Sequence, residues 1–322
     1  MDQVLVEVTR AGVVESQHRG TAVLMGASGE VIQAWGDPTR LIFPRSSMKP
    51  FQSLVMAETG LTLSSEQWAL SGASHEGESM HVTRVENWLA EMALTEANLV
   101  CGPAWPSHGK SRKAMVLAGG AARRAVHNCS GKHCGHLATC QHEGWDVDGY
   151  DDPSHPIQKR VLNRISELCD QAPDVVGVDG CSLPAPRLSL LGFARGLAAL
   201  AGLADDGERP ATTILSAAMK HPELTGGSTA MNGRLTKAGD GMLYAKNGAE
   251  GVYSVIFPKV RAALALKVTD GTQRAADIAA AGLIAKAGAL LSMDLSAVGA
   301  LSATGLRNAD GLDVGEIRFA PG

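Results

Sequence analysis

The sequence predicts an α+β fold, with one antiparallel sheet flanked by helices and a mainly helical part inserted in the middle. Strand patterns lie near both ends of the 322-residue chain, whereas apolar residues in the middle recur at helical spacings of three and four. Strands and helices do not alternate as they do in parallel sheets. We therefore expect both ends to share one sheet in a single unit, residues 1–322. Its sheet subdomain covers about 1–45 and 240–322, its helical subdomain covers about 46–239, and a cleft lies between them.

The strand predictions rest on partial alternation of apolar and polar residues and on the turns between them. The turn Ala27-Ser28-Gly29, between two such segments, predicts a hairpin. Gly36-Asp37-Pro38 then ends the second of these strands. The expected strands lie at 4–8, 21–25, 31–35, 251–257, 262–268 and 316–319.

The helix predictions rest on apolar faces and on end signals. Gly60 is a plausible end for the first helix, and Val82, Val85, Trp88 and Leu89 form one face of the second. The expected helices lie at 48–59, 64–94, 132–142, 156–170, 188–201, 210–220 and 272–290. Two segments rich in glycine, 101–108 and 226–240, predict loops.

Composition and missing motifs exclude several classes of function. The net charge of −4, with only three Tyr and five Phe, argues against a nucleic-acid partner. No run of 18 apolar residues and no signal peptide are visible, so we expect no membrane partner and a cytoplasmic location. The six cysteines are then expected to be thiols. Motifs for nucleotide binding and metalloprotease chemistry are missing.

The first chemical motif is S-x-x-K, formed by Ser46 and Lys49. At a helix start, residues three apart share one face, so the lysine can take the serine proton if its pKa is lowered. The tetrapeptide is short, and a second match at Ser107 and Lys110 lies in a loop. The structural alternative makes Ser46 a helix N-cap and Lys49 a solvated residue of the first turn.

The second motif is Lys246-Asn247-Gly248 at the start of a predicted strand. K-[ST]-G on a strand is typical of serine acyl-transfer enzymes of the β-lactamase class, and here Asn247 replaces Ser or Thr. The glycine lets a substrate lie close to the strand, and the lysine supplies positive charge. A plain turn is the structural alternative, and Lys267 is a competing strand lysine.

Two further segments carry polar chemistry. Ser74-His75 lies in a polar stretch that nearly fits a nucleophile elbow, except that Glu76 stands where G-x-S-x-G needs glycine. Adjacent side chains need not pair, and the structural alternative is a polar loop between helices with a helix cap. The segment 127–136, with Cys181 downstream, contains Cys129, Lys132, His133, Cys134 and His136. These residues could include metal ligands, although their spacing matches no common zinc module. Alternatively, Ser130 supplies the middle motif of the same cleft, or it caps a helix.

Taken in order, these blocks resemble the rhizobial-type L-asparaginases of the asparaginase II family. The resemblance runs from about residue 4 to the C-terminus, and its most specific parts are Asn128-Cys129-Ser130-Gly131-Lys132-His133 and Lys246-Asn247-Gly248-Ala249-Glu250-Gly251. It implies a fold similar to serine β-lactamases and to one class of glutaminases. It also implies hydrolysis of the side-chain amide of L-asparagine to L-aspartate and ammonia, by a homodimer.

The resemblance also assigns roles to residues of this chain. Ser46 would be the nucleophile and Lys49 its base, and Ser74 with Lys246 would form a second Ser-Lys pair. The remaining assignments are Cys129, Lys132 and Cys181 as zinc ligands, and Arg45, His133, Asp179 and Gly248 as residues of the substrate pocket. The zinc ion would adjust substrate binding, and no organic cofactor is expected.

Three alternatives stay open from the sequence. The closest is a glutaminase or another serine amidase of the same fold, acting on a β-lactam or a D-Ala peptide. One methylene changes binding by only about 1–3 kcal/mol, so sequence does not fix the choice between asparagine and glutamine. The others are a non-catalytic asparagine-binding protein and a zinc-dependent hydrolase.

Overall fold

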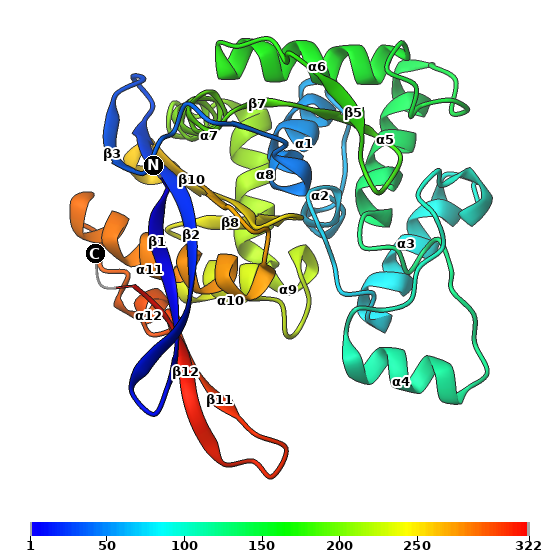
Figure 1. Ribbon diagram of the computed structural model, residues 1–322. Helices are drawn as coiled ribbons and strands as arrows, with labels where there is room; N and C mark the ends of the chain where they lie inside the picture. Colours follow the sequence, from blue (N-terminus) through cyan, green and yellow to red (C-terminus); the bar gives the residue numbers. More distant parts are fainter. Residues whose placement is uncertain (1, 321–322) are drawn as a thin grey trace.

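The protein is a mixed helix and strand structure built around a curled antiparallel sheet (Figure 1). The computed structural model describes residues 2–320. Within this part of the chain, the main sheet has the strand order β11-β12-β1-β2-β10-β9-β8, and β3 pairs with β2. These strands come from the two ends of the chain, as the sequence predicts. The α+β fold class is therefore confirmed, whereas the subdomain boundaries stay a prediction.

The strands of the main sheet form hairpins on each side of its centre. Their bounds are β1 (Gln3–Arg10), β2 (Val13–Gly26), β3 (Val31–Trp35), β8 (Tyr244–Gly248), β9 (Val252–Phe257), β10 (Ala262–Val268), β11 (Ala303–Arg307) and β12 (Asp313–Phe319). The predicted hairpin around Ala27-Ser28-Gly29 joins β2 and β3. Two small sheets pair β4 (Leu41–Ile42) with β7 (Leu188–Ser189) and β5 (Val176–Val178) with β6 (Pro184–Pro186).

Alternating residues of the central strands bury both faces of the sheet. In β2, Val23 and Met25 belong to a core with α7 (Leu190–Asp205), whereas Ala22 and Leu24 belong to a core with α11 (Gln273–Leu290). Because side chains of a strand alternate between faces, these two helices cover opposite sides. The sheet is thus a buried layer between helices.

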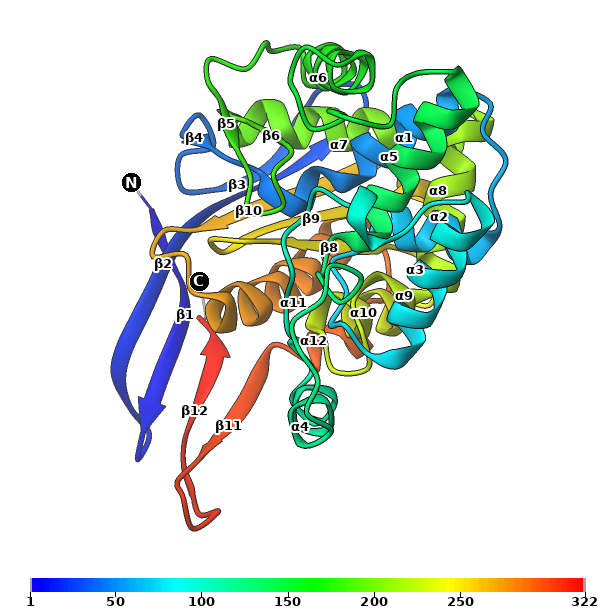
Figure 2. The same cartoon turned by 90° about the vertical axis from the view of Figure 1, so that its right-hand side faces the viewer.

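The middle of the chain is mainly helical and lies beside the sheet, in cyan and green (Figures 1 and 2). Its helices are α1 (Lys49–Glu58), α2 (Ser65–Ser71), α3 (Ser79–Glu91), α4 (Gly109–Leu117), α5 (Ser130–Glu143), α6 (Pro156–Cys169), α7, α8 (Arg209–Lys220), α9 (Pro222–Thr225) and α10 (Met231–Ala238). A short 3-10 helix, Arg45–Met48, precedes α1, and α12 (Ser296–Gly299) follows α11. Within residues 2–320, no helix combines the length and apolar character needed to cross a membrane.

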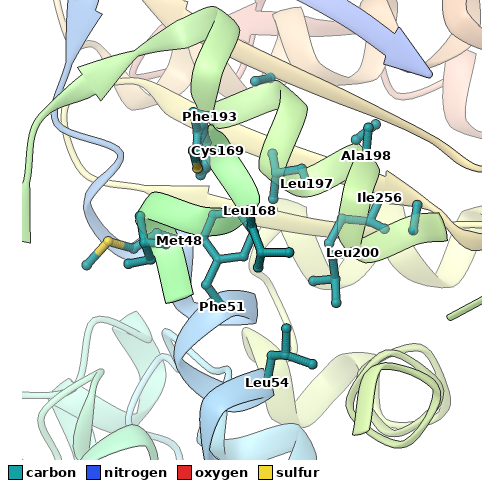
Figure 3. Close-up of a cluster of buried hydrophobic side chains, with 14 of the residues drawn as sticks. Met48, Phe51, Leu54, Leu168, Cys169, Phe193, Leu197, Ala198, Leu200 and Ile256 are labelled. Carbon is teal, nitrogen blue, oxygen red and sulfur yellow. The ribbon is translucent and has the colours of Figure 1, made fainter. Parts of the chain in front are cut away.

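A dense apolar cluster fixes α1 against α7 and the sheet (Figure 3). The rings of Phe51 and Phe193 meet edge to face, with centroids 5.9 Å apart. Leu54 and Ile256 lie in the same buried cluster. Burial of such side chains contributes about 1.5–3 kcal/mol each. This packing holds the start of α1, which carries the S-x-x-K motif, at a fixed place beside the sheet.

Two element predictions are wrong. The expected helix over 64–94 is two helices, α2 and α3, separated by an irregular segment that contains Ser74. The expected loop over 226–240 contains α10. In the first case, backbone bonds to distant segments end the helix: the N–H of Ser74 donates to the Thr225 carbonyl, and the N–H of His75 donates to the Asn128 carbonyl. Tertiary contacts therefore override the helical pattern.

Candidate active site

The S-x-x-K motif lies at the junction of the short 3-10 helix and α1. Ser46 is half-buried in the 3-10 helix, and Lys49 is the first residue of α1 with only 1% of its surface exposed. The N-cap of α1 is Met48, which makes no side-chain capping bond. The alternative of Ser46 as an N-cap with a solvated Lys49 is therefore wrong.

One hydrogen-bonded group contains the side chains of Ser74, Lys49 and Lys246. Lys49 Nζ lies 2.9 Å and Lys246 Nζ lies 2.8 Å from Ser74 Oγ. Lys246 extends from β8 and is fully buried, and Ser74 comes from the segment between α2 and α3. Three segments distant in sequence therefore place two amines on one hydroxyl. Lys267, the competing strand lysine, instead donates to the carbonyl of Glu250.

Both lysines of this group have a pKa below the usual range of lysine. Burial lowers the pKa of Lys49, and the charge of Lys132 adds to this effect. Burial also holds the pKa of Lys246 well below its usual range, and the nearby charge of Lys49 acts in the same direction. A lysine with a lowered pKa has a larger neutral fraction, which can accept a proton from a serine.

Ser46 lies three residues before Lys49 in sequence, but its hydroxyl is not bonded to that lysine. Lys49 Nζ bonds the Ala73 carbonyl, Ser74 Oγ and Cys129 Sγ. Within residues 2–320, the Ser46 hydroxyl has no hydrogen-bond partner, although its backbone carbonyl accepts the N–H of Lys49. Catalytic hydrogen bonds are often long before substrate binds, so this geometry leaves Ser46 available as a nucleophile.

Gly248 brings β8 directly against the Ser46 segment. A Cβ at Gly248 would lie 2.7 Å from the Pro44 carbonyl oxygen and 3.1 Å from the Ser47 N. The neighbouring strand supports the same segment, because Ser254 Oγ donates to the Ser47 carbonyl at 2.8 Å. A side chain at position 248 would push the two apart, so the glycine permits this close approach.

Arg45, directly before Ser46, is paired with Asp179. The Arg45 Nε lies 2.7 Å from Asp179 Oδ1, and both side chains are partly buried. Arg45 has a backbone φ of 54°, a left-handed conformation that non-glycine residues rarely adopt. These two residues, which the resemblance assigns to the substrate pocket, thus bind each other. Together they present a positive and a negative group side by side.

His133 is fully buried in α5 and its ring has one free nitrogen. Its Nδ1 lies 2.7 Å from the Tyr150 hydroxyl, whereas its Nε2 has no hydrogen-bond partner among residues 2–320. Burial lowers the pKa of His133 well below its usual value, so the ring is neutral. Buried polar atoms usually have a partner, and an open ring nitrogen is a position where a ligand can bind.

His75 does not pair with its neighbour Ser74. Its Nε2 lies 2.9 Å from Ser130 Oγ, and Ser130 in turn donates to the carbonyl of Ala125. Since the Ser130 proton is used there, the histidine Nε2 carries the donated proton. Its Nδ1 accepts the N–H of Gly77. These two residues therefore hold the segment around Ser74 onto α5, and Ser130 neither caps α5 nor contacts the two lysines.

The three predicted zinc ligands are brought together next to Lys49. Lys132 Nζ lies 2.9 Å from Cys181 Sγ, and Cys129 Sγ lies 3.2 Å from Lys49 Nζ. A hydrogen bond from Cys181 lowers the pKa of Cys129 well below its usual value. Cys134 and His136, the other candidates, are buried elsewhere on α5, where burial raises the pKa of the Cys134 thiol and lowers that of His136 to about 3.

The donor types of this cluster fit a zinc ion. Zinc prefers thiolate and nitrogen ligands, and Cys129 is the thiol that ionises first. Lys132 would have to lose its proton on binding, since the thiols of Cys181 and Cys129 outweigh its burial and raise its pKa. Among residues 2–320, no set of three His, Cys, Asp or Glu side chains is arranged for a metal.

Two residues that contact the site, Ala73 and Tyr150, were not singled out from sequence. The Ala73 carbonyl binds Lys49, and the Tyr150 hydroxyl binds His133. A backbone carbonyl leaves no signal in residue type. A buried tyrosine hydroxyl requires a hydrogen-bond partner, and this requirement is the signal that could have identified Tyr150. The count of three tyrosines alone does not show which of them is buried.

The model of the L-asparaginase II family matches residues 6–319, so the chain belongs to that family. This membership makes the chain an amidohydrolase with a small-molecule substrate. No curated protein sequence is significantly similar to the chain.

Solved structures are similar at the level of fold only. The crystal structure of Mglu aligns with a TM-score of 0.50 at 13% identity, covering 86% of this chain and 68% of Mglu. A β-lactamase (Mb2281c) from Mycobacterium bovis aligns with a TM-score of 0.42 at 14% identity, covering 82% of this chain and 94% of its own. Simvastatin synthase from Aspergillus terreus aligns with a TM-score of 0.38 at 10% identity, covering 81% and 88%.

Proposed function

We propose that this protein hydrolyses the side-chain amide of L-asparagine to L-aspartate and ammonia through an acyl-enzyme. The observation that carries the proposal is the contact of Lys49 and Lys246 with the single hydroxyl of Ser74, because Lys49 is also the residue three positions after Ser46. Membership of the L-asparaginase II family supports the choice of substrate. A buried pair of amines on a serine is suited to passing a proton between two steps.

The chemistry divides into two steps. Ser46 Oγ attacks the carboxamide carbon while Lys49 accepts the hydroxyl proton, giving a tetrahedral intermediate. The C–N bond then breaks, and the leaving nitrogen takes a proton that is passed through Ser74 and Lys246. Water attacks the resulting ester and returns Ser46 to its free form. We expect the backbone N–H of Ser46 and one on β8 after Gly248 to bind the oxyanion.

The substrate's α-amino acid group suits the Arg45–Asp179 pair. Its carboxylate can bind the guanidinium in a two-pronged contact, and its ammonium can bind the Asp179 carboxylate. The open Nε2 of the neutral His133 can bind a third polar group of the substrate. A small substrate with a carboxylate, an ammonium and a third polar group would thereby bind Arg45, Asp179 and His133.

Zinc is proposed at Cys129, Lys132 and Cys181. When bound, the ion would supply a positive charge and join the start of α5 to the turn that carries Asp179. Because Cys181 lies two residues from Asp179, this link is suited to ordering the substrate pocket. We assign it no part in the chemical step.

A specific observation favours a second assignment of the nucleophile. Ser74, and not Ser46, contacts both lysines. If Ser74 is the nucleophile, the reaction class is the same but the acyl group lies on a different residue. Mass spectrometry of the protein quenched during turnover locates the acyl group on one serine or the other.

The test of the substrate is ammonia release measured side by side from L-asparagine and L-glutamine. The proposal predicts a higher kcat/KM for asparagine. A higher value for glutamine would make the protein a glutaminase of the same fold, and binding of asparagine without ammonia release would make it a binding protein. The homodimer and the cytoplasmic location stay predictions, and light scattering of the purified protein tests the first.

A further inference from the structure

Asn247 surrounds the amine of Lys246 with oxygen atoms. Lys246 Nζ lies 2.5 Å from the Asn247 backbone carbonyl and 2.8 Å from its side-chain Oδ1. The third neighbour of this nitrogen is Ser74 Oγ at 2.8 Å. Lys246 is fully buried, whereas Asn247 is half-buried. Two of the three contacts of the lysine amine thus come from one residue.

The three oxygens around Lys246 Nζ limit how its N–H groups can be directed. A lysine nitrogen has three positions besides its bond to carbon, and these face three oxygens. The two oxygens of Asn247 carry no proton and only accept, so N–H groups must face them. The remaining position faces Ser74, whose hydroxyl can both give and take a proton. This position is an N–H when Lys246 is charged and a lone pair when Lys246 is neutral.

The same count fixes the amide of Asn247. A charged lysine donates three N–H groups and accepts none, so when Lys246 is charged the amide turns its oxygen toward it. Its NH₂ group is then directed away from the amine. A leucine side chain at position 247 offers no hydrogen-bond acceptor, so one N–H of the buried Lys246 amine would lose its partner.

We propose that Asn247 is a positioning residue that directs the amine of Lys246 at Ser74. This inference rests on the proposed function, because it concerns the proton relay of that reaction. It differs from a role in binding substrate, in which the NH₂ group of Asn247 would contact the ligand. The two roles predict different kinetic effects. Loss of positioning lowers kcat, whereas loss of a substrate contact raises KM.

The test compares Asn247→Leu, Asn247→Ala and Asn247→Ser with the wild-type protein in ammonia release from asparagine. The first two remove the side-chain acceptor, and the alanine variant serves if the leucine variant does not fold. The serine variant restores a shorter acceptor. We expect kcat of the leucine and alanine variants to fall by about 10-fold or more, as misplacement of a reacting group does. We expect KM to stay within about threefold and the serine variant to recover part of kcat.

Several outcomes would overturn the inference. One is an unchanged kcat in a folded Asn247→Leu or Asn247→Ala protein that binds and turns over asparagine. Another is a large rise in KM with kcat unchanged, which would make Asn247 a substrate contact. A third is a serine variant no more active than the alanine variant. If the wild-type protein itself releases no ammonia, the proposed function fails, and this inference fails with it.

Discussion

Lys246 Nζ lies 2.8 Å from Ser74 Oγ, although the two residues are far apart in sequence. The lysine belongs to the sheet, and the serine belongs to the helical part of the molecule. This contact spans the boundary between the two parts. The group of side chains around Ser74 is thereby assembled from the start of α1, the segment between α2 and α3, and β8.

Removing the Ser74 hydroxyl should impair the reaction and leave the fold intact. Ser74→Ala deprives both lysines of their shared partner, so we expect kcat to fall by about 100-fold or more, the usual contribution of a positioned proton-transfer group. Steady-state ammonia release measures this. The control is Ser79→Ala, an exposed serine at the start of α3, which should leave kcat unchanged. Equal activity of Ser74→Ala and wild type would contradict the relay.

The two strand lysines should differ sharply in importance. Lys246→Met removes an amine from Ser74 and should lower kcat by at least about 100-fold. Lys267→Met removes a lysine whose amine donates to the Glu250 carbonyl and not to Ser74, so it should keep kcat within about twofold. The same ammonia assay compares the two variants. A larger loss on replacing Lys267 would show that the wrong lysine has been assigned to the relay.

Zinc loss should affect substrate binding more than turnover. Cys181→Ser removes one thiol of the proposed ligand set, so the metal content per chain should fall and KM should rise with a smaller change in kcat. Metal analysis and steady-state kinetics provide the two readouts. Cys169→Ala, a buried cysteine of α6, is the control and should retain its metal. Wild-type protein without any bound zinc, and with unchanged kinetics after chelation, would contradict the metal assignment.

Gly131 should tolerate no side chain because α5 lies very close to α2 at this point. A Cβ there would lie 2.6 Å from the Leu70 carbonyl oxygen, so Gly131→Ala should lower the free energy of unfolding by about 1–3 kcal/mol. At Gly109, in α4, a Cβ would meet nothing within 4 Å, and Gly109→Ala should be neutral. Urea unfolding of both variants measures the difference. Equal stability of the two would be inconsistent with this packing.

The buried carboxyl of Asp277 should make stability depend on pH. Burial raises the pKa of Asp277, although Tyr253 and Gln273 donate hydrogen bonds to it. A raised pKa means that the folded protein holds this proton more tightly than the unfolded chain, so stability is lost as pH rises from the ordinary aspartate range through the raised pKa.

Asp277→Asn should remove this dependence. The wild-type Tm should fall relative to that of the variant as pH rises from about 4 through the raised pKa, and the gap should then stay constant. Thermal melting over this range measures the gap. A wild-type protein that gains stability relative to the variant over the same pH change would show that the carboxylate is favoured in the fold.

Local patterns in the sequence were sufficient for most of the sheet and for the ends of α1. The hairpin of β2 and β3 and the helix after Lys49 follow from turn and spacing signals that act between near neighbours. The S-x-x-K spacing correctly placed a buried lysine at a helix start. It did not predict that this lysine contacts Ser74, because residues 45–48 form a 3-10 helix and the partner arrives from another segment.

The remaining errors have a physical cause in long-range contacts. The segment around Ser74 is non-helical because its N–H groups bond to distant carbonyls. In α10, Asn232 and Gly233 weaken the helical pattern, yet a Cβ at Gly233 would lie 2.8 Å from the Pro222 carbonyl oxygen. That glycine is needed for packing between helices, and a single sequence does not distinguish this need from a loop.

In the proposed reaction, Ser46 carries the acyl group during hydrolysis of L-asparagine. The initial rate of ammonia release from L-asparagine by the wild-type protein and by Ser46→Ala tests this role. We expect release by the wild type and a loss of at least about 1,000-fold in the variant, as for removal of a nucleophile. A folded Ser46→Ala protein that turns over asparagine at the wild-type rate would contradict it.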